Sequence, residues 1–223
     1  LSLVGSEMCI RDRPRYKNGT FKNDTLEGFT EGNYWVYRFF VPHDVEGLVN
    51  LHGTKGNLAQ LLDLNYSKFG YGQHGNEQVH SNPYIYNYLN QPWKTQETID
   101  KTIATYGNAP WGIGNDDCGQ MSAWFVFNTM GFYPACPCKD EYVIGVPQVP
   151  KAVVNLGAYY ANKTFVMTAQ NLSLKNKYIQ NIKLNGKPLK TFIIKHQDII
   201  KGGSLEFEMG EKPNSRLFAK DKE

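Results

Sequence analysis

The sequence predicts an α+β fold in which helices come first along the chain and strands follow. Residues 14–133 carry apolar side chains at helical spacing, whereas from about residue 140 short β-branched or aromatic runs are broken by Gly, Pro and Asn. No internal repeat divides the chain at a fixed period. This order of elements is typical of α+β proteins or of two packed domains.

The helical half contains four segments with a helical pattern. Three of them have apolar residues on one face, and these are 57–69, 82–91 and 94–107. The third ends at Gly107, where a helix would stop. The segment 118–132 is apolar nearly all round, so we expect a buried inner helix there.

The second half contains short strand-like runs. The candidate strands are 141–147, 151–157, 163–170, the hairpin 182–189 and 204–210. Asn185 and Gly186 stand between apolar flanks, which is a strong signal for a hairpin turn. In the last run, Leu205, Phe207 and Met209 alternate with polar residues. The pattern therefore predicts roughly six or seven strands.

The two ends of the chain are treated separately. Residues 1–13 resemble a translated adapter sequence, so we exclude them from the fold and expect the true protein to extend further upstream. Residues 213–223 are charged, and we expect them to fray. This division leaves a helical region over residues 14–138 and a β-strand region over residues 139–212.

Composition excludes several classes of partner. The 223 residues are 41% hydrophobic and 20% charged, which is ordinary for a chain that buries a core. A net charge of +3 is too small to indicate nucleic acid or an anionic membrane, and no apolar run approaches the roughly 18 residues of a membrane span. The cysteines form no CxxC pair, so a structural zinc site is not expected. Aromatic residues cluster at 34–40, where core packing is the main expectation and a sugar-binding pocket the alternative.

Three acidic residues are bracketed by Gly or Asn and precede helical segments: Glu31, Glu77 and Asp117. One interpretation is that each acid satisfies the free N–H groups of a helix start, and Asp117 with Gln120 matches the spacing of a capping box. The other is that the helices begin around one mouth, in which case the three carboxylates converge on a single pocket. Capping and catalysis do not exclude one another.

A pocket with these acids suits two kinds of chemistry. Two carboxylates can hydrolyse a glycosidic bond, one as acid and one as base. A third carboxylate with amide oxygens suits a hard cation such as calcium. Zinc is the rival ion, through His74 and His80, but their spacing does not place them on one helix face and the HExxH motif is absent.

Four motifs carry a resemblance to a known family: residues 31–48, 74–96, 114–137 and 141–147. In this order they resemble the glycoside hydrolase family 92 α-mannosidases, and the resemblance runs from about residue 26 to residue 210. Members are calcium-dependent, inverting exo-α-mannosidases with an N-terminal β-sandwich domain and an (α/α)6 barrel. The resemblance implies that residues 14–138 form part of an incomplete (α/α)6 barrel, followed by an antiparallel β-rich region over residues 139–212.

The resemblance also assigns roles to individual residues. Glu31 matches the catalytic acid and Asp117 the general base. The calcium ion (Ca2+) would be held by Glu77, Asn76 and Asp117, and contacts with the sugar are assigned to Asn115, His74 and Trp35. Some members have a carboxylate where this chain has Asn115, so this amide would position water or sugar and cannot act as a base. Gln120 is a further candidate for a metal or sugar contact.

The activity implied by the resemblance is the release of terminal α-linked mannose, of the α-1,2 type, from N-glycan or mannan-type glycans in the periplasm or outside the cell. The 223-residue chain alone is expected to be inactive, because an upstream β-sandwich domain and the rest of the barrel would complete the site. Two other interpretations stay open. One is a non-catalytic carbohydrate-binding module, and the other is a structural fragment whose acids are only helix caps.

Overall fold

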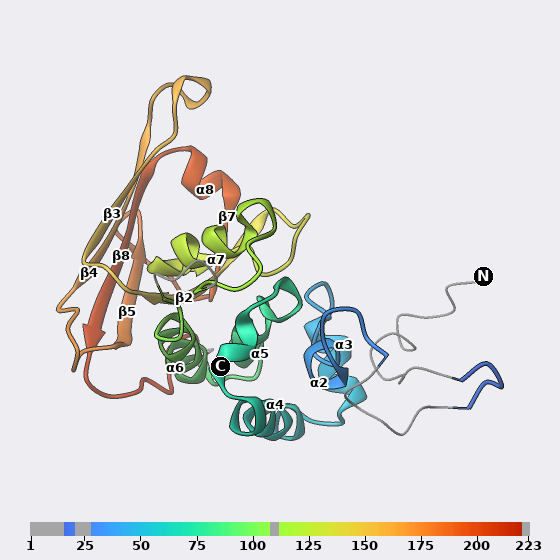
Figure 1. Ribbon diagram of the computed structural model, residues 1–223. Coiled ribbons are helices and arrows are strands. Elements are labelled where there is room, and N and C mark those ends of the chain that lie inside the picture. Colours follow the sequence, from blue (N-terminus) through green and yellow to red (C-terminus); the bar gives the residue numbers. More distant parts are fainter. Residues whose placement is uncertain (1–15, 21–27, 108–111, 220–223) are drawn as a thin grey trace.

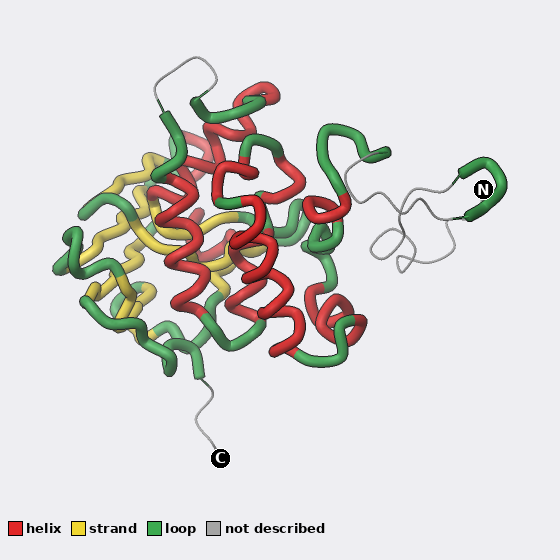
Figure 2. The backbone as a smooth tube through the Cα atoms, turned by 60° about the horizontal axis from the view of Figure 1, so that its bottom comes forward, coloured by secondary structure: helices red, strands yellow, loops and turns green. Residues whose placement is uncertain are grey.

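The computed structural model describes residues 16–20, 28–107 and 112–219. Helices gather on one side of the molecule and strands on the other, as Figure 1 and Figure 2 show. This arrangement agrees with the expected α+β class. The expectation for residues 1–13 lies outside the described residues. Among the residues described, no helix has the length and apolar character needed to cross a membrane.

The described α-helices are α2 (Tyr34–Tyr37), α3 (Val45–Leu51), α4 (Lys55–Phe69), α5 (Ile85–Tyr88), α6 (Pro92–Ile103), α7 (Gln120–Thr129) and α8 (His196–Ile200). The longest is α4, which begins where the hydroxyl of Thr54 accepts a hydrogen bond from the backbone N–H of Asn57. Its buried face packs with α3 and α5 around Leu48, Leu58 and Leu62. The predicted helices over 57–69 and 94–107 are therefore confirmed, with small differences at their ends.

The described strands are β1 (Met130–Tyr133), β2 (Glu141–Pro147), β3 (Lys151–Asn155), β4 (Thr164–Gln170), β5 (Tyr178–Leu184), β6 (Lys187–Pro188), β7 (Ile193–Lys195) and β8 (Gly203–Gly210). They form a three-stranded sheet in the order β1-β2-β7 and a five-stranded sheet in the order β3-β4-β8-β5-β6. The predicted hairpin turn is confirmed, because Asn185 and Gly186 both have positive φ between β5 and β6.

The larger sheet is mixed, which corrects the expectation of a wholly antiparallel region. β4 pairs with β8 in parallel, from Phe165 opposite Gly203 to Gln170 opposite Glu208. The chain completes β5, β6, β7 and α8 before β8 enters between β4 and β5. An alternating apolar pattern identifies a strand and its buried face, but it carries no information about the direction of the neighbouring strand.

Helix α7 is shorter and more exposed than the sequence indicated. It ends at Thr129, and residues 130–132, which were expected to be helical, belong to strand β1. Gly131 marks this change, since its φ is +89° and an added Cβ would come within 3.0 Å of Phe207. The expectation of burial all round is also wrong, because Phe125 is 37% and Val126 is 54% exposed.

The segment after β8 is docked rather than frayed. The side-chain amide of Asn214 donates a hydrogen bond to the carbonyl of Gln180 at 3.0 Å, and Leu217 is buried in the core of the β region. The segment is thus held against the β region at Asn214 and Leu217, contrary to the expectation of a loose tail. The remaining residues of the expected tail lie outside the described part of the chain.

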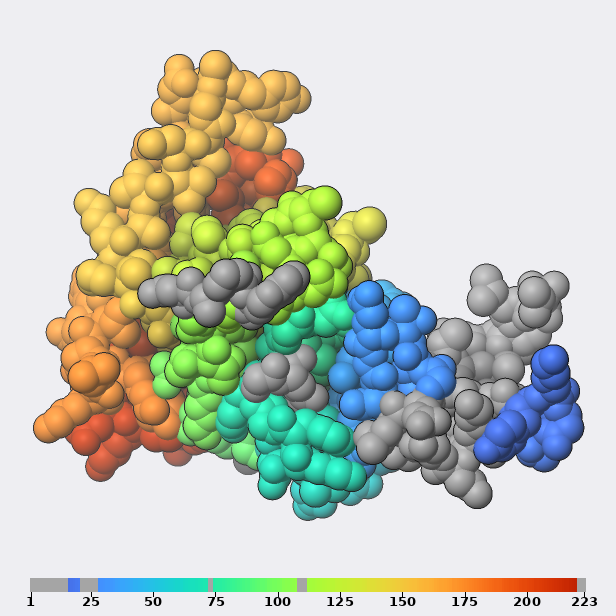
Figure 3. All heavy atoms as spheres, in the orientation of Figure 1, coloured from blue at the N-terminus to red at the C-terminus, as the bar shows by residue number. Residues whose placement is uncertain are grey.

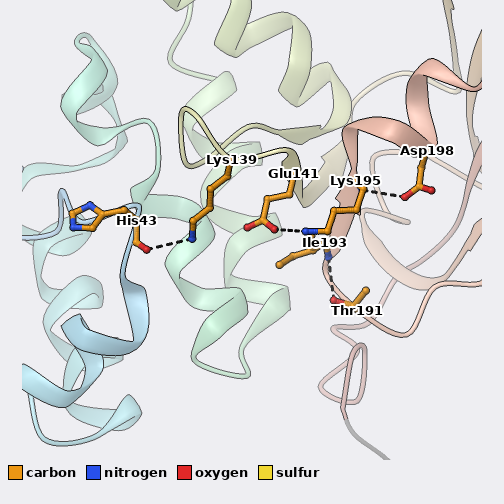
Figure 4. A network of polar contacts seen from close by, with 7 residues as sticks. All are labelled: His43, Lys139, Glu141, Thr191, Ile193, Lys195 and Asp198. Carbon is orange, nitrogen blue, oxygen red and sulfur yellow. Dashed lines mark hydrogen bonds and ion pairs between the residues drawn. The ribbon is translucent and has the colours of Figure 1, made fainter.

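The helical and β regions are in direct contact. On the face shown in Figure 3, the blue segment of α2 and α3 lies against the green segments that follow it. The yellow and orange segments of the strands lie beyond the green ones in this view. Lys139 donates a hydrogen bond from Nζ to the carbonyl of His43 in the helical region at 3.2 Å, and beside it the Lys195–Glu141 pair at 2.8 Å joins β7 to β2 (Figure 4). Buried Tyr84 and Ile99 from the helical region join the core of the β region. The sheet therefore supports the helices that carry the site.

Candidate active site

Glu31 lies in the turn that leads into α2 and is exposed. The N-cap of α2 is Asn33, whose side-chain oxygen accepts hydrogen bonds from the N–H groups of Trp35 at 2.8 Å and Val36 at 3.1 Å. Because Asn33 caps the helix, the Glu31 carboxylate is not needed for that purpose. Glu31 also has a φ of +50°, which is uncommon for a residue with a side chain and is typical of functional positions.

Asn76 joins the first acidic segment to the second. Its side-chain nitrogen donates a hydrogen bond to Oε2 of Glu31 at 3.0 Å, although the two residues are 45 positions apart. Its side-chain oxygen accepts from the N–H of Glu77 at 3.3 Å. The amide of Asn76 thus fixes the Glu31 carboxylate beside the segment that carries Glu77.

A contact between two glycines joins the second acidic segment to the third. The N–H of Asn115 donates to the carbonyl of Gly75 at 2.9 Å. A Cβ added to Gly114 would lie 2.4 Å from the Gly75 oxygen and 2.5 Å from its Cα, so no larger residue fits without movement. Gly114 also has a φ of +83°. The backbone of the third segment is therefore locked onto that of the second.

The adjacent acids Asp116 and Asp117 have different environments. Asp116 organises the start of α7, because its backbone carbonyl accepts from Gln120 at 2.7 Å and its carboxylate accepts from the N–H and the hydroxyl of Ser122, both at 2.9 Å. Asp117 has a φ of +40° and an exposed side chain. The capping-box interpretation of Asp117 with Gln120 is wrong, since the cap of α7 has no side-chain hydrogen bond. The Asp117 carboxylate therefore does not serve as the cap of α7.

Glu77 lies where the three acidic segments meet. Burial raises its pKa, and Asp117, through a side-chain hydrogen bond and its charge, and Glu31, through its charge, raise it further. The carboxylates are therefore close enough to interact. The segments that carry Glu31, Glu77 and Asp117 thus lie next to one another.

The donor atoms of this site suit a hard cation. Oε1 of Glu77 is buried and has no hydrogen-bond partner, and a buried carboxylate oxygen of this kind is a natural ligand for calcium. Within the described ranges, however, no group of three or more His, Cys, Asp or Glu side chains is close enough to hold a metal ion. Asn76 is already bonded through both ends of its amide. The carboxylate and amide oxygens of Glu77, Asp117 and Asn76 are of the type that calcium prefers, and they would supply only part of a coordination shell.

His74 lies deeper than a sugar contact requires. Its side chain has no exposed surface, and its ring stacks on Tyr66 at 6.0 Å and lies 5.5 Å from Trp124. Burial lowers the pKa of His74 to about 3, and the nearby His80 contributes in the same direction. His74 therefore packs in the core beside Tyr66 and Trp124, and its contact with the sugar stays a prediction.

Trp35 and Asn115 lie nearer the surface. Trp35 is half-buried, packs against Phe69 at 5.8 Å, and has Arg38 and Lys68 about its ring at 5.0 and 5.1 Å. Its ring is therefore part of a cation–aromatic cluster beside α2. Asn115 is exposed and lies two residues before Asp117. Of the three residues assigned to the sugar, Asn115 is the one most open to a ligand.

Sequence reasoning did not identify Tyr133, which lies under the site. Its hydroxyl is 3.2 Å from the side-chain nitrogen of Gln120 and 3.4 Å from Nδ1 of His80. Burial raises the pKa of Tyr133 to about 12, and the Glu77 carboxylate adds to this effect. The sequence gives no signal for this role, since the residue appears there only as one aromatic at the end of the helical half.

Two exposed acids in left-handed turns, with a third acid between them, are residue types that suit hydrolysis of a glycosidic bond. The comparison with protein families agrees. Residues 12–211 match the model of the glycosyl hydrolase family 92 catalytic domain. The chain belongs to this family.

Individual relatives support the assignment. An uncharacterized secreted glycosidase of Arthroderma benhamiae is 30% identical over 91% of this chain and 28% of its own length. A family GH92 α-mannosidase of Bacteroides thetaiotaomicron is 37% identical, with a TM-score of 0.81 over 92% of this chain and 29% of that one. A GH92 inverting mannosidase of the same organism is 33% identical, with a TM-score of 0.78 over 91% and 31%. The chain therefore spans less than a third of the length of these relatives.

Proposed function

We propose that this chain carries the acid and base of an exo-acting, inverting α-mannosidase that depends on calcium. The observation that carries the proposal is the convergence of Glu31, Glu77 and Asp117, joined through Asn76 and Gly75, in a domain of family 92. The helices that hold these acids would belong to an (α/α)6 barrel. Because the chain spans under a third of its relatives' length, activity is a property to be tested on the polypeptide that contains it.

The proposed substrates are mannose-containing glycans with a terminal α-linked residue, of the N-glycan or mannan type. Support comes from a structure of the first Bacteroides thetaiotaomicron relative with bound mannoimidazole, 34% identical to this chain with a TM-score of 0.83 over 93% of it and 31% of that chain. The preference for an α-1,2 linkage is part of the proposal. We also propose a secreted or periplasmic location, since the Arthroderma benhamiae relative is described as secreted.

In the proposed mechanism, the two exposed acids act on opposite faces of the sugar. Glu31, in its protonated form, donates a proton to the glycosidic oxygen as the bond from that oxygen to C1 breaks. Asp117 takes a proton from the water that attacks C1, and mannose is released with inverted configuration. The acid and base of an inverting enzyme are about 6.5–9.5 Å apart, which leaves room for this water.

The remaining residues would position the substrate and the ion. Asn76 holds the Glu31 carboxylate by its hydrogen bond, and the contact of Gly114 with Gly75 sets the position of Asp117 relative to Glu77. Calcium bound by Glu77 and Asp117 would supply electrostatic stabilisation of the sugar hydroxyls as the ring flattens. Asn115 is placed to contact the sugar or the attacking water.

The test is a hydrolysis assay on the polypeptide that contains this chain, with an α-1,2-linked mannobiose as substrate. Proton NMR at early times should show β-mannose as the first product. Glu31→Gln should abolish turnover, while Glu46→Gln, an exposed acid on α3, should not. A chelator should remove the activity and added calcium restore it. First formation of α-mannose would contradict the inverting mechanism, and full activity in chelator would contradict the role of calcium.

A non-catalytic carbohydrate-binding module has less support. It would be favoured by exposed aromatic residues aligned on one sheet face. The large aromatic side chains that are exposed among the described residues are Tyr16, Phe40, Phe125 and Tyr159. They lie in separate parts of the chain, and none belongs to a strand. Binding of mannosides without any hydrolysis by the wild-type polypeptide would nevertheless favour this alternative.

A further inference from the structure

A chain of hydrogen bonds runs from the surface of the candidate site into the core beneath it. It begins at Gln120, whose side chain is exposed three residues after Asp117. It continues through the hydroxyl of Tyr133, at 3.2 Å, to Nδ1 of His80, at 3.4 Å. It ends where Nε2 of His80 lies 3.0 Å from the sulfur of Met121.

The direction of each hydrogen bond follows from the last member of the chain. A thioether sulfur has no hydrogen to donate, so the proton lies on Nε2 of His80 and points at Met121. Burial lowers the pKa of His80 to about 4, so the ring is neutral and Nδ1 is an acceptor. Tyr133 therefore donates its hydroxyl proton to Nδ1. Its oxygen then accepts from the side-chain N–H of Gln120.

This order fixes the amide of Gln120. Its nitrogen is held inward by Tyr133, so its oxygen Oε1 faces outward as an acceptor. An amide without such a partner would rotate and present either end. The site around it is rich in acids, which accept hydrogen bonds but do not donate them when ionised.

The inner members of the chain are rigid. Tyr133 is 6% and His80 is 3% exposed, and the Tyr133 ring stacks on Tyr84 at 5.7 Å. The indole N–H of Trp124 donates to the carbonyl of His80 at 3.2 Å, which holds the backbone of that residue. Tyr133 is near enough to Glu77 for the charge of that carboxylate to raise its pKa, so the chain of hydrogen bonds passes close to one of the acids.

We propose that Gln120 is a further substrate-contacting residue whose Oε1 accepts a hydrogen bond from a hydroxyl of the bound sugar, and that Tyr133 and His80 are positioning residues that hold its amide in this orientation. The inference rests on the proposed function for its substrate class. A sugar hydroxyl is the group that matches an outward acceptor of this kind, because it donates one proton and leaves its oxygen available to other groups.

The experiment removes one hydroxyl and compares it with a matched control. Tyr133→Phe keeps the stacked ring and deletes the hydroxyl of the chain. Tyr84→Phe deletes the neighbouring hydroxyl, which bonds to Asn128 and is not part of the chain. The dissociation constant of mannoimidazole is measured by calorimetry at saturating calcium, in the polypeptide that contains this chain. Tyr133→Phe should weaken binding about three- to tenfold, whereas Tyr84→Phe should leave it unchanged.

A double-variant cycle tests whether Tyr133 acts through Gln120. Gln120→Ala should weaken binding by a similar factor, and adding Tyr133→Phe to it should cause no further loss. Additive losses would overturn the proposal, and so would equal effects of Tyr133→Phe and Tyr84→Phe. A change in calcium affinity with unchanged mannoimidazole affinity would overturn the sugar contact in favour of a metal contact.

A third measurement does not depend on sugar binding. The side-chain NH2 signals of Gln120 in ¹⁵N-labelled protein should show one proton protected from exchange, and this protection should be lost in Tyr133→Phe. Unchanged signals would overturn the positioning role. The wild-type polypeptide could show this protection and yet neither bind mannoimidazole nor cleave mannosides. That result would overturn the proposed function and the sugar contact, but it would leave the positioning of the Gln120 amide by Tyr133 supported.

Discussion

The helical and β regions of this molecule differ in how completely their buried polar atoms are paired. Some buried side-chain nitrogen and oxygen atoms of the described residues have no hydrogen-bond partner. All of these atoms belong to residues between 38 and 102. None lies in the β region described after residue 139, whose core is formed by side chains such as Phe165, Ile179 and Phe207. Unpaired buried polar groups cost free energy, and they are concentrated in the region that carries the acids.

The difference indicates that the β region mainly contributes stability, whereas the helical region mainly positions the acids. In the β region, apolar faces pack against each other and contribute stability. In the helical region, the three acidic segments are held by a few specific contacts, and two of the acids have left-handed backbones. A site that holds like charges together is not the most stable arrangement of its residues, so the neighbouring sheet has to support it. Variants in the two regions should therefore fail in different ways.

The largest effect is expected at the two adjacent acids before α7. Asp117→Asn should lower kcat for mannoside hydrolysis by about a thousandfold, because the general base is lost, with little change in the free energy of unfolding. Asp116→Asn should instead lower stability by about 1–2 kcal/mol through weaker hydrogen bonds to Ser122, with a much smaller effect on kcat. Turnover and urea denaturation of both variants provide the measurement. A loss of stability for Asp117→Asn equal to that for Asp116→Asn would contradict the different roles of the two acids.

The next effect is a loss of stability in the β region. Phe207 is 1% exposed and contacts Gly131 where α7 gives way to β1. Phe207→Ala should lower the free energy of unfolding by about 3–5 kcal/mol, because it leaves a cavity in the core. Chemical denaturation measures this loss. The comparison is Tyr159→Ala, a residue that is 91% exposed, which should change stability by less than about 0.5 kcal/mol. Similar losses for both would contradict the view that the sheet core is the main source of stability.

The sequence predicted the elements better than it predicted their surroundings. Apolar spacing located α4 and α6, the strands β2, β3, β4 and β8 and the β5–β6 hairpin, since these patterns depend on local geometry, but it missed the short strand β7. It did not reveal the parallel pairing of β4 with β8, nor the exposed face of α7 at Val126, because both depend on what packs against the element. Local pattern therefore specifies an element, and its neighbours are specified by contacts distant in the chain.

The acids of the site were predicted by residue type and local context, whereas their supporting residues were not. Glu31, Glu77 and Asp117 stand out in the sequence because each is bracketed by Gly or Asn and precedes a helical segment. The role of Tyr133 depends on a contact with His80, 53 residues earlier, which no local pattern encodes. The full burial of His74 was missed for the same reason, since its position in a polar motif gave no indication of it.

The third prediction concerns the pH dependence of stability in the helical region. Burial lowers the pKa of His74 to about 3 and that of His80 to about 4, so the folded protein keeps both imidazoles neutral in mild acid. The unfolded chain binds protons at both below about pH 6.5. The unfolded state therefore takes up more protons, and stability falls as the pH decreases below 6.5, by about 1.4 kcal/mol per pH unit for each residue.

Urea denaturation between pH 7 and pH 4.5 measures this dependence. His74→Phe keeps a ring stacked on Tyr66 and removes one titrating group, so the slope of stability against pH should become shallower. An unchanged slope in this variant would show that other groups control the acid sensitivity. Phe207→Ala, in the β region, should lower stability without altering the slope.

The smallest effects are expected at two asparagines that hold turns in the two regions. Asn33→Ala removes the side chain that caps α2, and Asn185→Ala removes the side chain that accepts a hydrogen bond from the N–H of Ser204 at 2.9 Å. Each substitution should cost about 1 kcal/mol of stability.

The effects of the two substitutions on catalysis should differ, because Asn33 lies two residues after Glu31 and Asn185 lies in the β5–β6 turn. Asn33→Ala should lower kcat about tenfold by loosening the turn that orients the acid, a cost that misplacement of a catalytic group readily produces. Asn185→Ala should leave kcat unchanged. Equal kcat values for the two variants at equal stability would mean that the Glu31 turn is held by Asn76 alone.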